Sequence, residues 1–230
     1  MKNIVFLVAM LIIASNLVAF TGWELGTHDG TPNLRFQLIA GTTTDVRVGR
    51  GNVTATTFIG DVVIPSTVEI DGTTYTVRGI ASTALGFRDQ TSLFGVTIPS
   101  TVTQIGFRAF ENTRLRGHVV IPNSVTTIEY EAFSRILISG TGFTIELPNY
   151  LTIIENNLFE GSLGLTSVII PPSVTEIGIQ AFQNTGLTGH VTIPNSVTTI
   201  ENRAFSRIMS TGFTIELPDN LTTIQTELFF

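Results

Sequence analysis

Apolar and polar residues alternate along this chain in short runs, and the runs recur at a regular spacing. Each unit is a strand-like run ending in Ile-Pro or Leu-Pro, then a short polar turn, then a second apolar pair. Seven prolines mark the units: Pro65, Pro99, Pro122, Pro148, Pro171, Pro194 and Pro218. Five of the six spacings run from 23 to 26 residues. A period of that size is typical of a solenoid, whose units bury their apolar faces only by stacking on one another.

One unit illustrates the predicted coil. Residues 93–98 predict a short strand with apolar side chains turned inward, and Pro99 ends it because proline has no amide hydrogen for the ladder. Val102 and Ile105 form the next inward pair, and Phe110 closes the coil. We therefore predict a mainly β repeat solenoid, with a stacked parallel sheet on one side and short turns or helical turns on the other.

A small or aliphatic residue followed by phenylalanine recurs once per unit. The pairs are Ala109-Phe110, Ala132-Phe133, Leu158-Phe159, Ala181-Phe182, Ala204-Phe205 and Leu228-Phe229, with Ala84-Leu85 as a divergent first copy. An aromatic ring at the same point of every coil lies next to the rings of its neighbours. We predict that these phenylalanines stack into one continuous buried column.

The start of the chain predicts export. Lys2 precedes an apolar run over residues 4–14, and Ala19 is a small residue suited to cleavage, so residues 1–19 read as a secretory signal peptide. The alternative is an uncleaved anchor, because residues 4–20 reach the short limit for spanning a bilayer.

Residues 20–58 lack the proline pattern and contain short strand-like runs at 36–39 and 46–48. We interpret them as an amino-terminal cap, and residues 59–230 as a solenoid of seven repeats, the last incomplete. The long first spacing between prolines contains residues 68–77, in which an Asp-Gly pair between β-prone residues predicts a hairpin. This hairpin either helps to seal the first repeat or is a binding finger.

A second level of repetition lies above the first. Residues 96–136 match residues 168–208 at 29 of 41 positions, and residues 141–159 match 211–229 at 13 of 19. A block of three repeats has therefore been copied. Such a copy lengthens a solenoid without redesigning it, which favours a protein that works through an extended surface over an enzyme with one pocket.

The composition of the chain argues against several classes of function. The net charge is −6 and basic residues do not cluster, which argues against a nucleic-acid partner. Cysteine is absent, so disulfides and thiolate metal sites are excluded. We find no nucleophile elbow, P-loop, dinucleotide fingerprint or His-Glu-x-x-His motif, and we predict no enzymatic activity, no cofactor and no metal. Glu129 and Glu131 are neighbours in sequence, but residue 203 in the copy is arginine, so we expect both carboxylates to face solvent.

The repeat at residues 96–110 (VTIPSTVTQIGFRAF) resembles the BspA-like, or treponemal-type, bacterial leucine-rich repeats. Residues 170–178 repeat the pattern, and the resemblance covers residues 61–229. It implies a leucine-rich repeat coil in a secreted or cell-surface protein that adheres to host extracellular-matrix proteins or to other cells. In the family a cysteine often follows the Ala-Phe pair by three residues. Thr113 and Thr185 stand there in this chain, and we expect them to fill the same space.

Outward positions of the predicted strands provide the candidate contact face. His118 and His190 are equivalent residues of the copied block, about 14 Å apart if three strand spacings separate them, so they cannot share one metal ion. The predicted protein-contact residues are Thr97, His118, Val120, Glu146, Ile169, His190, Thr192 and Glu216. Mixed β-branched and small polar residues suit a broad protein contact better than a tight pocket. They also suit a passive structural spacer that binds nothing.

The chain stops at Phe230, within the seventh repeat. An uncovered solenoid end exposes apolar surface and a sheet edge. We expect either a truncated fragment of a larger envelope protein or self-association through this end. No second apolar segment is long enough to cross a membrane after removal of the signal.

Overall fold

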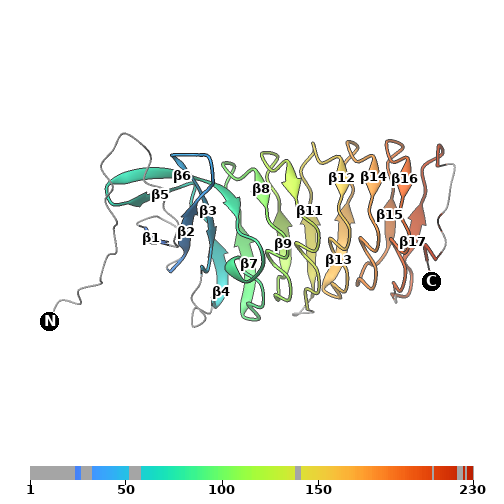
Figure 1. The fold of residues 1–230 in the computed structure, drawn as a ribbon. Helices are drawn as coiled ribbons and strands as arrows, with labels where there is room; N and C mark the ends of the chain where they lie inside the picture. Colours follow the sequence, from blue (N-terminus) through green and yellow to red (C-terminus); the bar gives the residue numbers. More distant parts are fainter. Residues whose placement is uncertain are drawn as a thin grey trace.

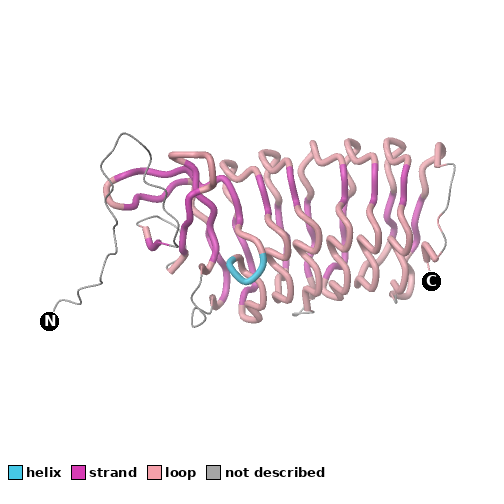
Figure 2. The backbone as a smooth tube through the Cα atoms, viewed as in Figure 1, coloured by secondary structure: helices cyan, strands magenta, loops and turns pink. Residues whose placement is uncertain are grey.

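The chain winds into an elongated coil of stacked turns, with strands on two sides of each turn (Figure 1). The computed structural model describes residues 24–26, 33–51, 58–137, 141–208, 210–221, 225 and 227–229. In these residues the one helical element is the 3-10 turn η1 (Thr83–Leu85), and strands alternate with loops elsewhere (Figure 2). The predicted mainly β repeat solenoid is confirmed.

The longer strands form a parallel sheet along one side, whose outward surface we call the long-strand face. They are β4 (Gly60–Val63), β7 (Leu93–Thr97), β9 (Gly117–Val120), β11 (Phe143–Glu146), β13 (Leu165–Ile169), β15 (His190–Thr192) and β17 (Thr214–Glu216). Backbone hydrogen bonds join the segments of this sheet, such as Arg116 N to Phe94 O at 2.9 Å and Thr188 N to Thr166 O at 3.1 Å. The strand pairs β4–β7, β9–β11, β11–β13 and β15–β17 are all parallel, as successive coils of a solenoid require.

Two-residue strands form a second parallel sheet on another side of the coil. They are β8 (Gln104–Ile105), β10 (Thr127–Ile128), β12 (Ile153–Ile154), β14 (Glu176–Ile177) and β16 (Thr199–Ile200). At the amino-terminal end this sheet continues into β6 (Thr73–Ile80), β3 (Asp45–Gly49), β2 (Arg35–Leu38) and β1 (Glu24–Leu25). In each of the five two-residue strands from β8 to β16 the second residue is a buried isoleucine, which explains the inward pair predicted from the repeat.

The repeated prolines occupy the same point of successive coils. At Pro99, Pro122 and Pro148 the proline carbonyl accepts a hydrogen bond from the amide three residues later, at 2.9–3.1 Å. The same turn recurs at Pro171, Pro194 and Pro218. Proline suits this corner because it ends the ladder of the preceding strand and presets φ for the turn.

The predicted hairpin is confirmed. Strands β5 (Thr67–Ile70) and β6 pair antiparallel, and Ile70 lies opposite Thr73. The two turn residues have positive φ, 51° at Asp71 and 75° at Gly72, which is the turn expected for an Asp-Gly pair.

The strand predictions near residues 36–39 and 46–48 are also confirmed, as β2 and β3. These two strands pair antiparallel, and β3 joins the parallel sheet through β6. The division of the chain at residues 58 and 59 stays a prediction. Phe58 is buried and its ring meets that of Phe87 edge-on at 5.4 Å.

Phenylalanines stack through the centre of the coil. Ring centroids from Phe87 to Phe205 lie 5.0–6.0 Å apart, and successive rings are inclined by only 10° to 25°. The column contains Phe87, Phe110, Phe133, Phe159, Phe182 and Phe205, all at most 1% exposed. Offset parallel rings at this separation attract one another beyond the burial of their area.

Two members of the predicted column are wrong. The first copy is Gly86-Phe87 and not Ala84-Leu85, because the amide of Phe87 donates to Ala109 O, just as Phe110 donates to Ala132 O one coil later. A side chain at Gly86 would come within 2.3 Å of the Ala81 carbonyl oxygen, so this position excludes alanine. At the other end, Phe229 is 43% exposed and Leu228 is the buried residue.

The described residues include no helix long and apolar enough to cross a membrane. The predicted signal peptide, residues 1–19, lies outside the described residues and stays a prediction.

Truncation of one ring tests the column. Phe133→Ala should lower the free energy of unfolding by about 3–5 kcal/mol, because it removes a fully buried ring and leaves a cavity between two coils. Urea unfolding followed by circular dichroism measures the change. Tyr150→Ala is the control: this ring is 72% exposed, and its loss should change stability by less than about 0.5 kcal/mol. Equal effects of the two substitutions would contradict the column.

Candidate functional site

The long-strand face carries all eight residues predicted to contact a protein. Each is exposed: Thr97, His118, Val120, Glu146, Ile169, His190, Thr192 and Glu216. Parallel pairing places them in columns across the strands, with His118 beside Thr144 and Val120 beside Glu146. The structure therefore brings these side chains onto one surface, while their contact with a protein stays a prediction.

Exposed aliphatic side chains stand among the polar ones on this face. Ile169 is 73% exposed and Val120 is 44% exposed. On the same strands Val119 and Val168 point inward and are buried. The alternation explains the pattern, because successive residues of a strand face opposite sides of the sheet.

Two identical side-chain clusters lie on the face, one in each copy of the duplicated block. In the first, His118 Nδ1 lies 2.9 Å from Thr144 Oγ1, and His118 Nε2 lies 3.6 Å from Glu146 Oε2. In the second, the corresponding distances from His190 are 3.0 Å to Thr214 Oγ1 and 3.4 Å to Glu216 Oε2. We call each His, Thr and Glu set a trio. The sequence placed both histidines and both glutamates on this face, but it did not predict that each histidine pairs with residues of the next coil.

A shallow hollow lies beside the first trio. Its lining is Asp61, Phe94, Gly95, Val96, Thr97, Arg116, Gly117, His118 and Thr141. The guanidinium of Arg116 lies over the Phe94 ring, 4.4 Å from its centroid. In the second copy, threonines replace both residues, as Thr188 and Thr166. The hollow is therefore one of the places where the two halves of the face differ.

The side of the coil next to the phenylalanine column, which we call the turn side, has an unusual backbone. Two residues per coil, flanking the buried phenylalanine, adopt positive φ although most are not glycine. Such residues are Arg108, Asn112, Glu131, Arg135, Asn157, Gln180, Asn184, Arg203 and Arg207, with φ between 53° and 59°. A left-handed conformation costs non-glycine residues about 1–2 kcal/mol each. Hydrogen bonds between coils offset this cost, as from Phe133 N to Leu158 O at 3.1 Å.

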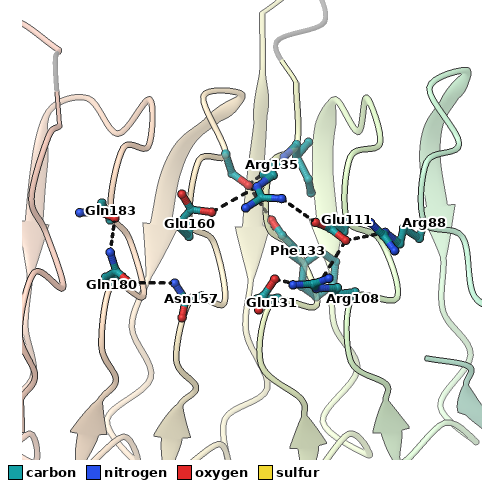
Figure 3. Close-up of polar contacts among 12 residues, drawn as sticks. Arg88, Arg108, Glu111, Glu131, Phe133, Arg135, Asn157, Glu160, Gln180 and Gln183 are labelled. Atoms are coloured by element: carbon teal, nitrogen blue, oxygen red, sulfur yellow. Dashed lines mark hydrogen bonds and ion pairs between the residues drawn. The ribbon is translucent and has the colours of Figure 1, made fainter. Parts of the chain in front are cut away.

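These turns bring charged side chains from different coils together around Glu111 (Figure 3). The Glu111 side chain is only 2% exposed, and three arginines surround it. Arg88 Nε lies 2.6 Å from Oε2, Arg108 Nε lies 3.6 Å from Oε2, and Arg135 Nη1 lies 3.1 Å from Oε1. A buried carboxylate is tolerated here because several cations compensate for its lost hydration.

The ion pairs extend to the next coils. Arg108 Nε donates to Glu131 Oε2 at 2.7 Å, and this hydrogen bond raises the pKa of the Arg108 guanidinium, partly opposed by desolvation. In the second half of the coil, hydrogen bonds between neutral side chains replace the ion pairs. Asn157 donates to Gln180, and Gln180 donates to Gln183 (Figure 3). Most of the charged side chains described on the turn side are thus paired with one another, although Arg88 Nε and Glu111 Oε2 make their 2.6 Å contact without hydrogen-bond geometry.

In the last described coils the side-chain contacts are again between charged groups. Arg203 donates a hydrogen bond to Glu227, and this contact lowers the pKa of the Glu227 carboxyl and raises that of Arg203. Both groups lie at the surface.

The expectation that Glu129 and Glu131 face solvent is wrong. Glu129 Oε2 accepts a hydrogen bond from Phe107 N at 2.6 Å, and the Glu131 side chain is 16% exposed and paired with Arg108.

Thr113 and Thr185 do fill the buried position after the Ala-Phe pair. Each also donates its hydroxyl to the carbonyl of the column phenylalanine three residues earlier, at 2.9 and 3.0 Å.

Among the described residues, no group of three or more histidines, aspartates and glutamates is placed to hold a metal ion. The two trios each bring one imidazole and one carboxylate. The long-strand face combines exposed aliphatic residues with exposed polar groups that are loosely paired.

A sequence profile described as BspA type leucine rich repeat region matches this chain in six copies, over residues 80–208 and 138–230. Together these stretches span more than half of the 230 residues. Among proteins with curated functions, none matches the sequence.

Solved structures of bacterial leucine-rich repeat proteins are similar to this fold. A leucine rich cell surface protein from Faecalibacterium prausnitzii has a TM-score of 0.59 and 25% identity, covering 86% of this chain and 56% of that one. The T. pallidum leucine rich repeat protein has a TM-score of 0.64 and 25% identity, covering 85% and 83%. The pneumococcal vaccine antigen PcpA has a TM-score of 0.63 and 22% identity, covering 86% and 51%. This chain thus spans about half the length of two of the three.

Removal of the buried charge tests the cluster around Glu111. Glu111→Gln should lower the free energy of unfolding by about 1–3 kcal/mol, because three arginines lose their shared partner while the shape of the side chain is kept. Glu160→Gln is the matched control, because that carboxylate is 24% exposed and has one contact, with Arg135 at 3.5 Å. Its loss should cost under about 1 kcal/mol. Urea unfolding at neutral pH measures both, and a cost for Glu160→Gln as large as that for Glu111→Gln would contradict the assignment.

Proposed function

The chain belongs to the family of BspA type leucine rich repeats, and from this membership we propose that it is a secreted or cell-surface protein that binds other proteins. The binding surface is the long-strand face, and the partner is a protein of the host extracellular matrix or of another cell surface. Binding proceeds by many weak contacts along the solenoid, and no catalytic step is involved.

The surface location rests on the relatives. The F. prausnitzii protein, 25% identical, is described as a leucine rich cell surface protein. Leucine-rich repeat solenoids serve as scaffolds for interaction, because stacked repeats create long, regular surfaces. The predicted signal peptide at residues 1–19 agrees with export.

The observation that carries the proposal is the exposure of Ile169 and Val120 among small polar residues on a flat sheet. A side chain like Ile169, 73% exposed, gains most from being covered by a partner. Glu146 pairs with Val120 on one side and with Ile169 on the other. Exposed apolar and hydrogen-bonding side chains therefore alternate along the strip, and a protein interface uses both kinds of group.

The turn side is the less suitable surface for a partner. Its charged groups are already paired with one another, as around Glu111, and a partner would have to replace those contacts. Displacing satisfied polar groups costs free energy unless the new contacts reproduce them.

The alternative is a passive spacer or a fragment of a larger envelope protein, with no binding activity of its own. The two proposals differ in what they expect of the exposed aliphatic residues. A spacer needs solubility from its surface, whereas a binding face needs the apolar side chains themselves.

Matched substitutions separate the two. The face variant is Val120→Glu with Ile169→Glu, and the control variant is Ile153→Glu with Ile179→Glu, whose side chains are 39% and 42% exposed and lie away from the long-strand face. Biolayer interferometry of the full chain against extracellular-matrix proteins and intact bacterial cells should show saturable binding. The face variant should weaken it about tenfold or more, equivalent to about 1.4 kcal/mol, and the control should leave it within about twofold.

Absence of saturable binding to any of these surfaces supports the spacer. Equal loss in the two variants would contradict the assignment of the face, because both variants add the same charge to the same solenoid.

A further inference from the structure

The charges of this chain are distributed unevenly along its length. Residues 136–230 contain eight carboxylate side chains and only two basic ones, Arg203 and Arg207, whereas the rest of the chain contains ten of each sign. No lysine or arginine occurs in residues 136–202. The two arginines belong to the turn side, where both have positive φ. Strands β11, β13, β15 and β17 of the long-strand face therefore carry carboxylates and no lysine or arginine.

The two glutamates on these strands are exposed and loosely held. The side chains of Glu146 and Glu216 are 56% and 63% exposed. Their Oε2 atoms lie 3.6 Å from His118 Nε2 and 3.4 Å from His190 Nε2, and Thr192 also donates to Glu216 Oε2 at 3.3 Å. No hydrogen bond from a described residue reaches the Oε1 atom of either glutamate. Both carboxylates are therefore open to a cation from outside the chain.

Aliphatic side chains flank the first of these carboxylates on both sides. Strand register places Glu146 between Val120 and Ile169, one strand spacing of about 4.8 Å from each. Lysine and arginine have an apolar stem and a charged head, and they bury the stem along apolar surface while the head stays polar. A basic side chain thus fits this strip, with its stem over Ile169 or Val120 and its charge at Glu146. An acidic side chain would be repelled, and an apolar one would remove water from the carboxylate without replacing its hydrogen bonds.

The second carboxylate lies farther along the same strip. Glu216 pairs with Thr192, and a backbone hydrogen bond joins β15 to β13, which carries Ile169. Glu146 and Glu216 are thus three strands apart, or about 14 Å. In an extended segment, residues i and i+4 lie about 13–14 Å apart and project to the same side. Residue i+2 of such a segment would lie above Ile169 and Thr192.

We propose that this part of the long-strand face binds an extended basic segment of a partner protein. Basic residues at positions i and i+4 of the segment meet Glu146 and Glu216, and an apolar residue at i+2 covers Ile169. The proposal rests on the proposed function, in which the long-strand face binds a protein, and it adds the chemistry of the segment that is bound. The single sign of charge on these strands favours such a segment before contact as well as in the complex.

Titration with a short peptide tests the proposal directly. The probe is Thr-Lys-Thr-Ile-Thr-Lys-Thr, blocked at both ends, added up to about 5 mM to the full chain labelled at isoleucine methyl groups. Nuclear magnetic resonance should show a saturable shift of the Ile169 methyl signal. The Ile153 methyl, which lies on a strand of the second sheet, should not shift. Raising NaCl from about 50 to about 500 mM should weaken binding, because salt screens exposed charges.

Two control peptides and a matched pair of variants define the contacts. A peptide with glutamate in place of both lysines should not bind, and the isomer Thr-Lys-Lys-Thr-Ile-Thr-Thr should bind more weakly. The double variant Glu146→Gln, Glu216→Gln should weaken binding of the probe about fivefold or more, since it removes two exposed ion pairs. Glu155→Gln with Glu176→Gln is the control. It removes the same charge next to and within strands of the second sheet, and it should leave affinity within about twofold.

Equal affinity of the wild-type chain and the Glu146→Gln, Glu216→Gln variant would overturn the proposal. Equal binding of the lysine peptide and either control peptide, or no shift of Ile169 at all, would also overturn it. Failure of the proposed function looks different. A partner protein whose binding is lost in the Val120→Glu, Ile169→Glu variant but is unchanged by salt and by the two glutamine substitutions would preserve the face as a binding surface and contradict only the basic segment.

Discussion

Stacking of each coil on the next is the constraint on which the rest of the structure depends. A single unit has strands of two to five residues and one phenylalanine of the stacked column, too little to bury its own apolar side chains. Neighbouring coils supply both the ladder hydrogen bonds and the partners for the ring, as Phe110 and Phe159 do for Phe133 on its two sides. The left-handed turn residues persist because the same stacking satisfies their backbone groups. Local strain and lateral packing are thus coupled in every coil.

The same stacking makes the two sides of the coil chemically different. On the turn side, coils approach closely around the phenylalanine column, and side chains such as Glu111, Arg108 and Arg135 meet between coils and neutralise one another. On the long-strand face, outward side chains are separated by a strand spacing and remain accessible. Duplication of a three-repeat block then extends that face and repeats its chemistry, which is why one His, Thr and Glu trio appears twice. A repeat protein built in this way can change its contacts without changing its core.

Much of the fold could be predicted from the sequence, because its determinants are local and periodic. Each of the seven repeated prolines follows a strand, and a phenylalanine every 23 to 26 residues can only meet its neighbours in a coil. The site was less predictable, because its contacts join residues one coil apart. Glu131 seemed solvent-facing from its own surroundings, but Arg108 in the preceding coil pairs with it. The partners of His118 likewise follow from strand register, which the sequence alone does not set. Gly86-Phe87 was missed because a glycine was not expected in place of alanine, although Phe87 keeps the period.

Contact between successive phenylalanine rings is the most direct measure of the coil. Nuclear magnetic resonance of the chain with ring-protonated phenylalanine in a deuterated background reports such contacts as cross-relaxation between ring protons. The structure predicts a connected series from Phe87 through Phe205, because neighbouring centroids lie 5.0–6.0 Å apart. Rings that show no cross-relaxation with their neighbours in adjacent coils would contradict the stacked solenoid and the surfaces built on it.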